Sequence, residues 1–117
     1  MPWFFTTQKR NTSRFRLASM TLESAALSEK ARNRSKAHTL EVLDTVTRYW
    51  SYPSSNPNAK VIIFIHGYRG NHHGLEAIAG ALEDFHVIIP DLPGFGESTP
   101  FAETHTIERY AAWLAEF

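Results

Sequence analysis

A run of seven residues, Val61-Ile-Ile-Phe-Ile-His-Gly67, decides the fold class of this chain. A strand with one face in solvent alternates apolar and polar side chains, but residues 61–65 are all apolar and four of them are Val or Ile. Such an unbroken β-branched run is typical of a parallel strand that is covered on both faces. The run therefore predicts a buried strand over 61–65 that ends in a glycine-bearing loop, 66–70.

A helix and a second buried strand follow this loop. Residues 73–83 carry apolar side chains at helical spacing, and His86-Val-Ile-Ile89 is predicted as the next buried strand, which Pro90 ends. Strand, helix and strand in close succession make a βαβ unit, whose two strands lie parallel in one sheet. A further helix is expected from Thr106 to Phe117, because apolar residues recur there at the same spacing and Thr106 can act as its N-cap.

Two other segments lie upstream of the deciding run. β-prone residues between 39 and 50, with a turn at Leu43–Asp44, predict an antiparallel strand pair. Residues 1–36 contain eight of the twelve Lys and Arg but only two of the twelve Asp and Glu. Their formal charge is therefore +6, and that of residues 37–117 is −6. We therefore divide the chain into a basic, disordered or weakly helical leader, 1–37, and a folded part, 38–117. Met20 is an alternative to Met1 as the start of the chain.

The composition narrows the function classes. The formal net charge is zero, which gives no electrostatic argument for a nucleic-acid partner. The 117 residues contain no cysteine, so a Cys nucleophile and thiolate metal sites are excluded, and a reducing, cytoplasmic location is favoured. No apolar run reaches the roughly 20 residues that a membrane helix needs. A transit peptide stays open for the leader, because residues 1–22 are basic, contain Ser and Thr, and lack acids.

A second glycine-bearing loop completes the pattern. In Asp91-Leu-Pro-Gly-Phe-Gly-Glu-Ser98, Gly94 and Gly96 can take positive φ, and Asp91 can cap its turn. Together, VIIFIHG at 61–67 and PDLPGFGES at 90–98 resemble two loops of the α/β-hydrolases. These are the His-Gly oxyanion loop after the third strand and the Asp-x-x-Gly-x-Gly-x-Ser loop after the fourth. As in that family, one helix and one strand separate the two motifs.

The resemblance, which covers residues 39–117, implies a partial α/β-hydrolase fold. It would consist of an N-terminal antiparallel strand pair, a βαβ unit and a helix, truncated before the nucleophile elbow. It implies nucleophilic hydrolysis of small ester-like or related substrates, with an oxyanion stabilised by preorganised backbone N–H groups. By position, one donor is the N–H of Tyr68, in the oxyanion loop that His66 and Gly67 begin. The resemblance makes four residues of the second loop structural: Asp91, Gly94, Gly96 and Ser98.

The sequence departs from the family because it lacks the catalytic triad. No Gly-x-Ser-x-Gly elbow occurs in it, and His86 and His105 come too early to be the triad base. The last predicted helix has no Gly or Pro stop signal, so we expect the nucleophile, acid and base to lie beyond Phe117. This chain alone is therefore expected to be inactive.

Other interpretations remain beside this one. The main alternative is a non-catalytic binding or interaction module that uses the same core. A dinucleotide site would need a glycine where Thr99 stands, and the loop from Gly67 to Gly70 lacks the Lys-Ser/Thr of a P-loop. The leader could bind nucleic acid, but only through its charge. No metal and no cofactor are expected, because no carboxylate stands at ligand spacing to His66, His72 and His73. The expected partner is a small-molecule substrate, with no nucleic acid and no membrane.

Overall fold

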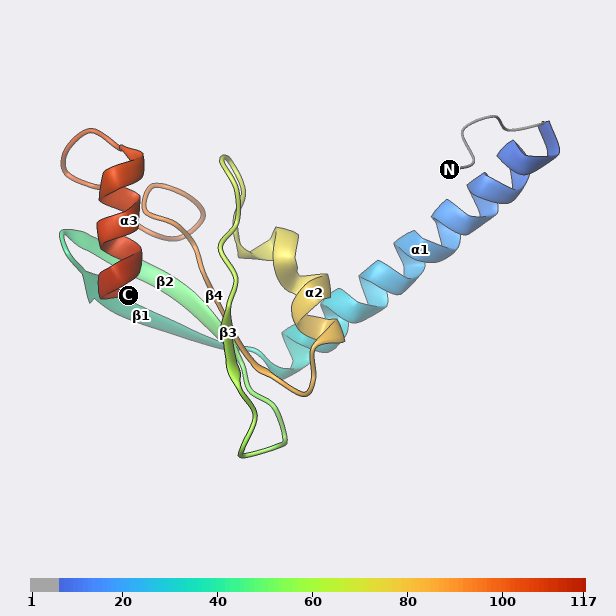
Figure 1. Cartoon of the computed structure of the whole chain (residues 1–117), viewed down its shortest axis with the longest axis horizontal. Coiled ribbons are helices and arrows are strands. Elements are labelled where there is room, and N and C mark those ends of the chain that lie inside the picture. Colours follow the sequence, from blue (N-terminus) through green and yellow to red (C-terminus); the bar gives the residue numbers. More distant parts are fainter. Residues whose placement is uncertain (1–6) are drawn as a thin grey trace.

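The computed structural model describes residues 7–117, with side chains from Thr21 onward (Figure 1). Within this part of the chain, no helix is long and apolar enough to cross a bilayer. The elements follow in this order: α1 (Thr7–Arg34), β1 (Lys36–Val42), β2 (Thr45–Tyr52), β3 (Val61–Ile63), the 3-10 helix η1 (His72–Leu75), α2 (Glu76–Ala81), β4 (His86–Pro90) and α3 (Ile107–Glu116).

One mixed sheet of four strands, in the order β1-β2-β4-β3, forms the centre of the fold. β1 and β2 form an antiparallel hairpin in which Val42 lies opposite Thr45, and β2 pairs antiparallel with β4. β3 pairs with β4 in parallel, with Ile62 opposite Val87. The predicted architecture, an antiparallel strand pair followed by a βαβ unit and a helix, is therefore confirmed.

Helices lie on both faces of this sheet. The core on one face joins β2 and β4 to α1 and α2, through Ala31, Trp50, Tyr52, Ala79, Val87 and Ile89. Alternate residues of a strand point to opposite faces, so Thr47 of β2 points away from this core. The buried Trp113 of α3 donates its indole N–H to the Thr47 hydroxyl at 3.0 Å. α3 therefore packs on the other face, near the β1–β2 hairpin (Figure 1).

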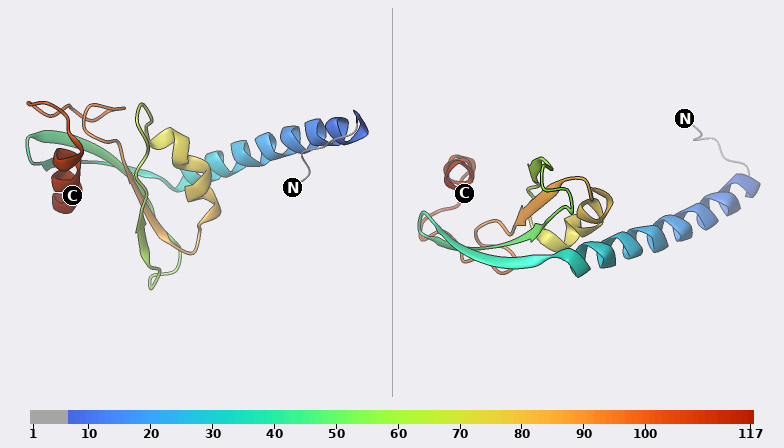
Figure 2. Two further views of the ribbon diagram at one scale, coloured as in Figure 1. Left: turned by 45° about the horizontal axis from the view of Figure 1, so that its top comes forward. Right: turned by 90° about the horizontal axis from the view of Figure 1, so that it is seen from below.

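The N-terminal segment, expected to be disordered or weakly helical, contains a long helix. Residues 1–6 lie outside the described residues, but α1 is one continuous helix that projects well beyond the sheet (Figure 2). Its last turns dock on α2, where a Cβ on Gly80 would lie 2.0 Å from the Leu27 carbonyl oxygen. Because only glycine allows this approach, Gly80 lets the two backbones touch. The expected boundary after residue 37 falls inside β1, and α1 docks on the core, to which it contributes Ala31.

The guanidinium of Arg34 strengthens this docking. It donates to the carbonyl oxygens of Ala79 and Leu82 at the end of α2, the latter at 3.3 Å, and to that of Pro53 at 3.1 Å. The last carbonyls of a helix lack intrahelical partners and carry partial negative charge, so a cation there is favourable. Arg34 thus caps α2 from a neighbouring helix.

β3 is shorter and more exposed than predicted. It spans Val61–Ile63 instead of 61–65, although the Phe64 N–H still donates to the Ile88 carbonyl at 3.0 Å. Val61 and Ile63 are 59% and 44% exposed. Both side chains therefore lie partly in solvent, and in the described part of the chain β3 has no partner strand on its outer side. The prediction of a strand covered on both faces was wrong for the face to which they point.

Candidate functional site

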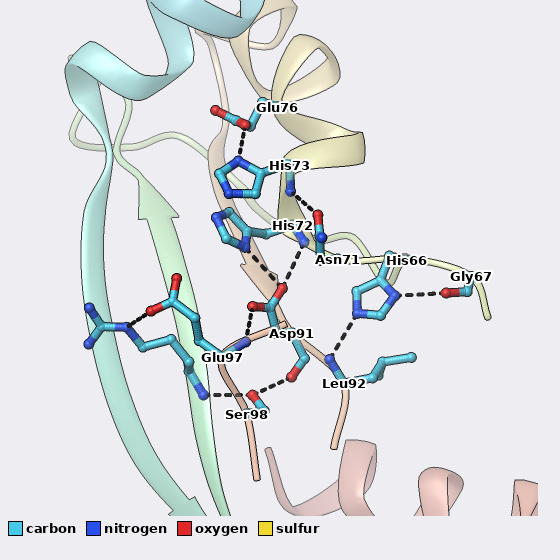
Figure 3. Close-up of polar contacts among 11 residues, drawn as sticks. His66, Gly67, Asn71, His72, His73, Glu76, Asp91, Leu92, Glu97 and Ser98 are labelled. Atoms are coloured by element: carbon cyan, nitrogen blue, oxygen red, sulfur yellow. Dashed lines mark hydrogen bonds and ion pairs between the residues drawn. The ribbon is translucent and has the colours of Figure 1, made fainter. Parts of the chain in front are cut away.

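His66 joins the two glycine-bearing loops through both ring nitrogens. The Leu92 N–H donates to Nε2 at 2.9 Å, so Nε2 carries the lone pair (Figure 3). Nδ1 then carries the proton and donates to the Gly67 carbonyl at 2.8 Å. With both nitrogens engaged within the protein, His66 links the loop after β3 to the loop after β4 and is not available as a base.

The two glycines of the first loop meet different requirements. The Gly70 N–H donates to the Gly67 carbonyl at 3.0 Å, and it is Arg69 that takes a positive φ of +62° in this turn. A Cβ on Gly70 would crowd Nδ1 of His66 at 3.2 Å, whereas a Cβ on Gly67 would meet nothing within 4 Å. The described fold therefore does not itself require glycine at 67. Its absent side chain leaves open space beside the backbone, which a substrate can approach.

Tyr68, the expected source of the oxyanion donor, lies at the exposed tip of this loop. Its backbone N–H makes no hydrogen bond within residues 7–117. Its side chain is 86% exposed and meets Phe95 of the second loop edge-on, with ring centroids 5.8 Å apart. The Tyr68 N–H is therefore an unused backbone donor at the point where the two loops meet.

A mainly apolar hollow of about 620 Å³ lies between the two loops and the start of α3. Backbone and side-chain atoms of both predicted loops contribute to its wall. The lining residues are His66, Tyr68, Leu92, Gly94, Phe95, Pro100, His105, Thr106, Ile107 and Tyr110. The structure thus brings the predicted oxyanion loop and the second loop together around one concave surface.

Asp91 ties the second loop to η1. Its buried carboxylate accepts the backbone N–H of His72 at 2.7 Å and ring Nδ1 of His72 at 3.0 Å on Oδ1, and the Glu97 N–H at 2.9 Å on Oδ2 (Figure 3). Burial opposes ionisation of this carboxyl, but the hydrogen bonds from His72 and Glu97 outweigh burial and lower the pKa of Asp91. Asp91 was predicted to cap its own turn. Its carboxylate also binds His72 of η1.

Gly94 and Gly96 both have positive φ, +85° and +52°. A Cβ on Gly96 would lie 2.1 Å from Oδ2 of Asp91, so glycine is needed both for the backbone conformation and for the approach of the carboxylate. A Cβ on Gly94 would lie 2.9 Å from Cε1 of His105. These two glycines therefore let the loop fold tightly around Asp91 and accept His105 against its backbone.

Ser98 uses its hydroxyl inside the fold. Oγ donates to the Asp91 carbonyl at 2.7 Å and accepts the Arg48 N–H at 2.8 Å, and the residue is 8% exposed. A buried hydroxyl with both of these partners joins the second loop to β2. This geometry does not suit a nucleophile, which must be free to reach substrate.

His72 and His73 belong to a polar cluster that the sequence analysis did not find. The His72 ring stacks on Trp50, with centroids 3.3 Å apart, and His73 Nδ1 contacts Glu76, which also pairs with Arg32 at 3.2 Å. Carboxylates do therefore stand beside both rings, contrary to the expectation from spacing. No group of three or more metal-ligating side chains is found in the described part of the chain. The separation of His73 and Glu76 by three residues in a helical segment was the one available signal.

The elements that carry these loops match a known family. The family model described as alpha/beta hydrolase fold matches residues 60–117, which include β3, β4, α3 and both loops. This chain belongs to the α/β-hydrolase fold family. The two loops therefore lie at the ends of β3 and β4 of an α/β-hydrolase fold.

The related proteins include lipases. The chain is 38% identical over 64 residues to Lipase 3 of Moraxella sp. (strain TA144), covering 54% of this chain and 20% of that protein. It is 46% identical over 46 residues to Lipase 1 of Psychrobacter immobilis, covering 39% of this chain and 14% of that protein. A solved candidate lipase from Acinetobacter baumannii AYE superposes with a TM-score of 0.66 and 26% identity, covering 80% of this chain and 32% of that one. The 117-residue chain thus spans a third or less of each of these relatives.

Proposed function

We propose that this chain is the N-terminal part of an α/β-hydrolase that cleaves small ester-like substrates by nucleophilic catalysis. The observation that carries the proposal is the unused Tyr68 N–H, in a loop fixed by His66 and bordering an apolar hollow. The two lipase relatives support an ester as the substrate class. The cysteine-free sequence supports a cytoplasmic location.

The proposed role of this loop is to stabilise negative charge. Attack on an ester carbonyl places charge on the carbonyl oxygen, and preorganised N–H donors at that position lower the barrier. Tyr68 would supply one such donor, because its N–H is not committed to the fold. Gly67 would let the substrate oxygen approach the backbone, since no side chain blocks that space. His66 would keep the donor in position by binding Leu92 across the site.

The nucleophile and its partners are proposed to come from polypeptide beyond the 117 residues. The relatives are three to seven times longer than the matched stretches, and no Gly-x-Ser-x-Gly occurs in this sequence. Removing the nucleophile or base of a triad costs roughly 10⁶-fold in kcat, so the chain alone should not hydrolyse esters. An oxyanion loop stabilises the charge that develops on the carbonyl oxygen, but this charge develops only after a nucleophile attacks the ester.

The first test is the DNA that follows the Phe117 codon, in all three frames. We expect an apolar strand, a Gly-x-Ser-x-Gly elbow, and then an acid and a His in that order. The polypeptide encoded through that region should hydrolyse p-nitrophenyl butyrate, and the 117-residue chain should not. If no elbow and no later His are encoded, the hydrolase proposal fails and the non-catalytic binding module replaces it.

The second test separates the Tyr68 backbone from its side chain in the longer polypeptide. Tyr68→Pro removes the N–H and should lower kcat by about 10²- to 10³-fold. Tyr68→Phe and Tyr68→Ala keep the N–H and should stay within about tenfold of the parent in kcat. Equal losses in all three variants would show that the N–H has no special role. Thermal unfolding of each variant checks that the fold is retained.

A further inference from the structure

The hollow contains a polar pair that the proposed hydrolysis does not use. The Tyr110 hydroxyl lies 2.8 Å from the Pro93 carbonyl oxygen and 2.7 Å from Nδ1 of His105. A carbonyl oxygen can only accept, so the hydroxyl donates its hydrogen to Pro93. The hydroxyl oxygen must then accept from the imidazole, and in the neutral ring the proton of His105 lies on Nδ1.

This pair of hydrogen bonds leaves Nε2 of His105 as an acceptor. Nε2 carries the lone pair of the neutral ring, and it has no hydrogen-bond partner within residues 7–117. The ring is also held in place, with Phe101 4.9 Å away between centroids and the Gly94 backbone packed against Cε1. Burial raises the pKa of Tyr110, so its hydroxyl keeps the proton that it donates to Pro93 at neutral pH. His105 therefore presents an oriented acceptor at the wall of the hollow.

The rest of the wall suits a hydrocarbon chain. Leu92, Phe95 and Ile107 line the hollow, and Ile107 is 81% exposed. Covering such a side chain with an aliphatic group removes apolar surface of both partners from water, which is favourable. A neutral imidazole acceptor cannot bind an ether or carbonyl oxygen, because two acceptors share no hydrogen. It can bind a hydroxyl.

We propose that the hollow binds the aliphatic part of a substrate that carries a free hydroxyl group, and that Nε2 of His105 accepts the hydrogen bond from that hydroxyl. The inference rests on the proposed function and narrows its substrate class to esters whose alcohol or acyl part keeps an unesterified hydroxyl. Tyr110 acts as a positioning residue, since it sets the tautomer of His105 without touching the ligand.

The test compares two isomeric probes, 1-octanol and heptyl methyl ether, which differ in having a hydroxyl donor. The 117-residue chain is immobilised at low density through its N-terminus, because β3 leaves an apolar edge exposed, and binding is measured by surface plasmon resonance. One neutral hydrogen bond should make octanol bind about two- to tenfold more tightly than the ether. His105→Phe should abolish this preference and leave ether binding within about twofold of the parent. His105→Gln keeps an acceptor and should keep part of the preference.

Each outcome decides a separate step. Equal affinities for the two isomers would overturn the hydroxyl preference, and a preference that survives His105→Phe would overturn the role of His105. Tyr110→Phe should weaken the octanol preference and leave ether binding unchanged; an unchanged preference would overturn the tautomer argument. Failure of both probes to bind a chain with native circular dichroism would overturn the hollow as a binding site. None of these results requires a nucleophile, so ester hydrolysis by the longer polypeptide stands or falls independently.

Discussion

Replacing Asp91 by Asn tests whether one buried carboxylate holds the second loop to η1. In the native chain, two donors from His72 and one from the Glu97 backbone converge on its two oxygens. Asparagine keeps one acceptor oxygen but places an NH₂ group where the other oxygen was. In either orientation of the amide, donor faces donor at one side of the side chain. The substitution also removes the negative charge that strengthens the hydrogen bonds from these donors.

The expected loss of stability is large for a chain of this size. Hydrogen bonds to a charged group contribute about 1.5–3 kcal/mol each, but bonds to one carboxylate are not additive. Leaving a buried hydrogen-bonding group unsatisfied costs about 1–3 kcal/mol, which we take as the loss for Asp91→Asn. Small domains are stable by only about 5–15 kcal/mol, so the variant should unfold at a much lower urea concentration.

Urea unfolding, followed by tryptophan fluorescence and by circular dichroism, measures how much Asp91→Asn lowers the free energy of unfolding. Trp50 stacks on His72 and so reports directly on the affected contact. Glu97→Gln is the matched control, because only the backbone of residue 97 binds Asp91 and its side chain forms an exposed pair with Arg48 at 3.6 Å. That pair should contribute less than about 1 kcal/mol. If Asp91→Asn lowers the free energy of unfolding no more than Glu97→Gln does, the Asp91 carboxylate does not hold the second loop to η1.

Acid titration should remove the same stabilisation. Because the folded-state pKa of Asp91 is lowered from 3.8, its carboxylate contributes fully to the free energy of unfolding above about pH 4. This contribution is lost as the pH falls through the folded-state pKa. Urea midpoints of Asp91→Asn across the acid range should lack this part of the pH dependence. Gly80→Ala should cost about 1–3 kcal/mol and speed amide exchange in the last turns of α1, because its Cβ would meet the Leu27 carbonyl; Gly74→Ala, whose Cβ meets nothing within 4 Å, should leave that exchange unchanged. Ile63→Lys should reduce association of the isolated chain in light scattering at matched concentrations, since Ile63 is 44% exposed beside an unpaired strand edge; unchanged association would place the contact elsewhere.

The sheet could be predicted because its signal is local. Apolar runs at 61–65 and 87–89, with a helical segment between them, specify two parallel strands and a crossover. The docking of α1 left no such signal. It depends on a backbone contact at Gly80 and on one guanidinium, Arg34, that reaches carbonyls more than forty residues away. Neither contact produces a periodic apolar pattern, so the segment looked like a solvated leader.

Only those residues of the site that lie within the two loop motifs could be predicted from the sequence. The two loops locate Gly67, Tyr68 and the glycines around Asp91, because those residues stand at fixed positions within each motif. The pairs that fix side chains, His72 with Asp91 and His105 with Tyr110, join residues whose identities alone do not reveal a contact. The tautomers of the histidines follow from such contacts and from nothing in the sequence.

The predicted oxyanion loop is held by contacts among these 117 residues. His66 binds Leu92, Gly70 binds Gly67, and Asp91 holds the second loop to η1. A donor that stabilises a transition state must already be in place when charge develops, because any reorganisation at that moment would raise the barrier. Under the proposed function, the backbone donor of this loop is therefore already held in position in the 117-residue chain, without the nucleophile. The Tyr68 N–H has no acceptor within residues 7–117, and under the proposed function its partner would be the substrate.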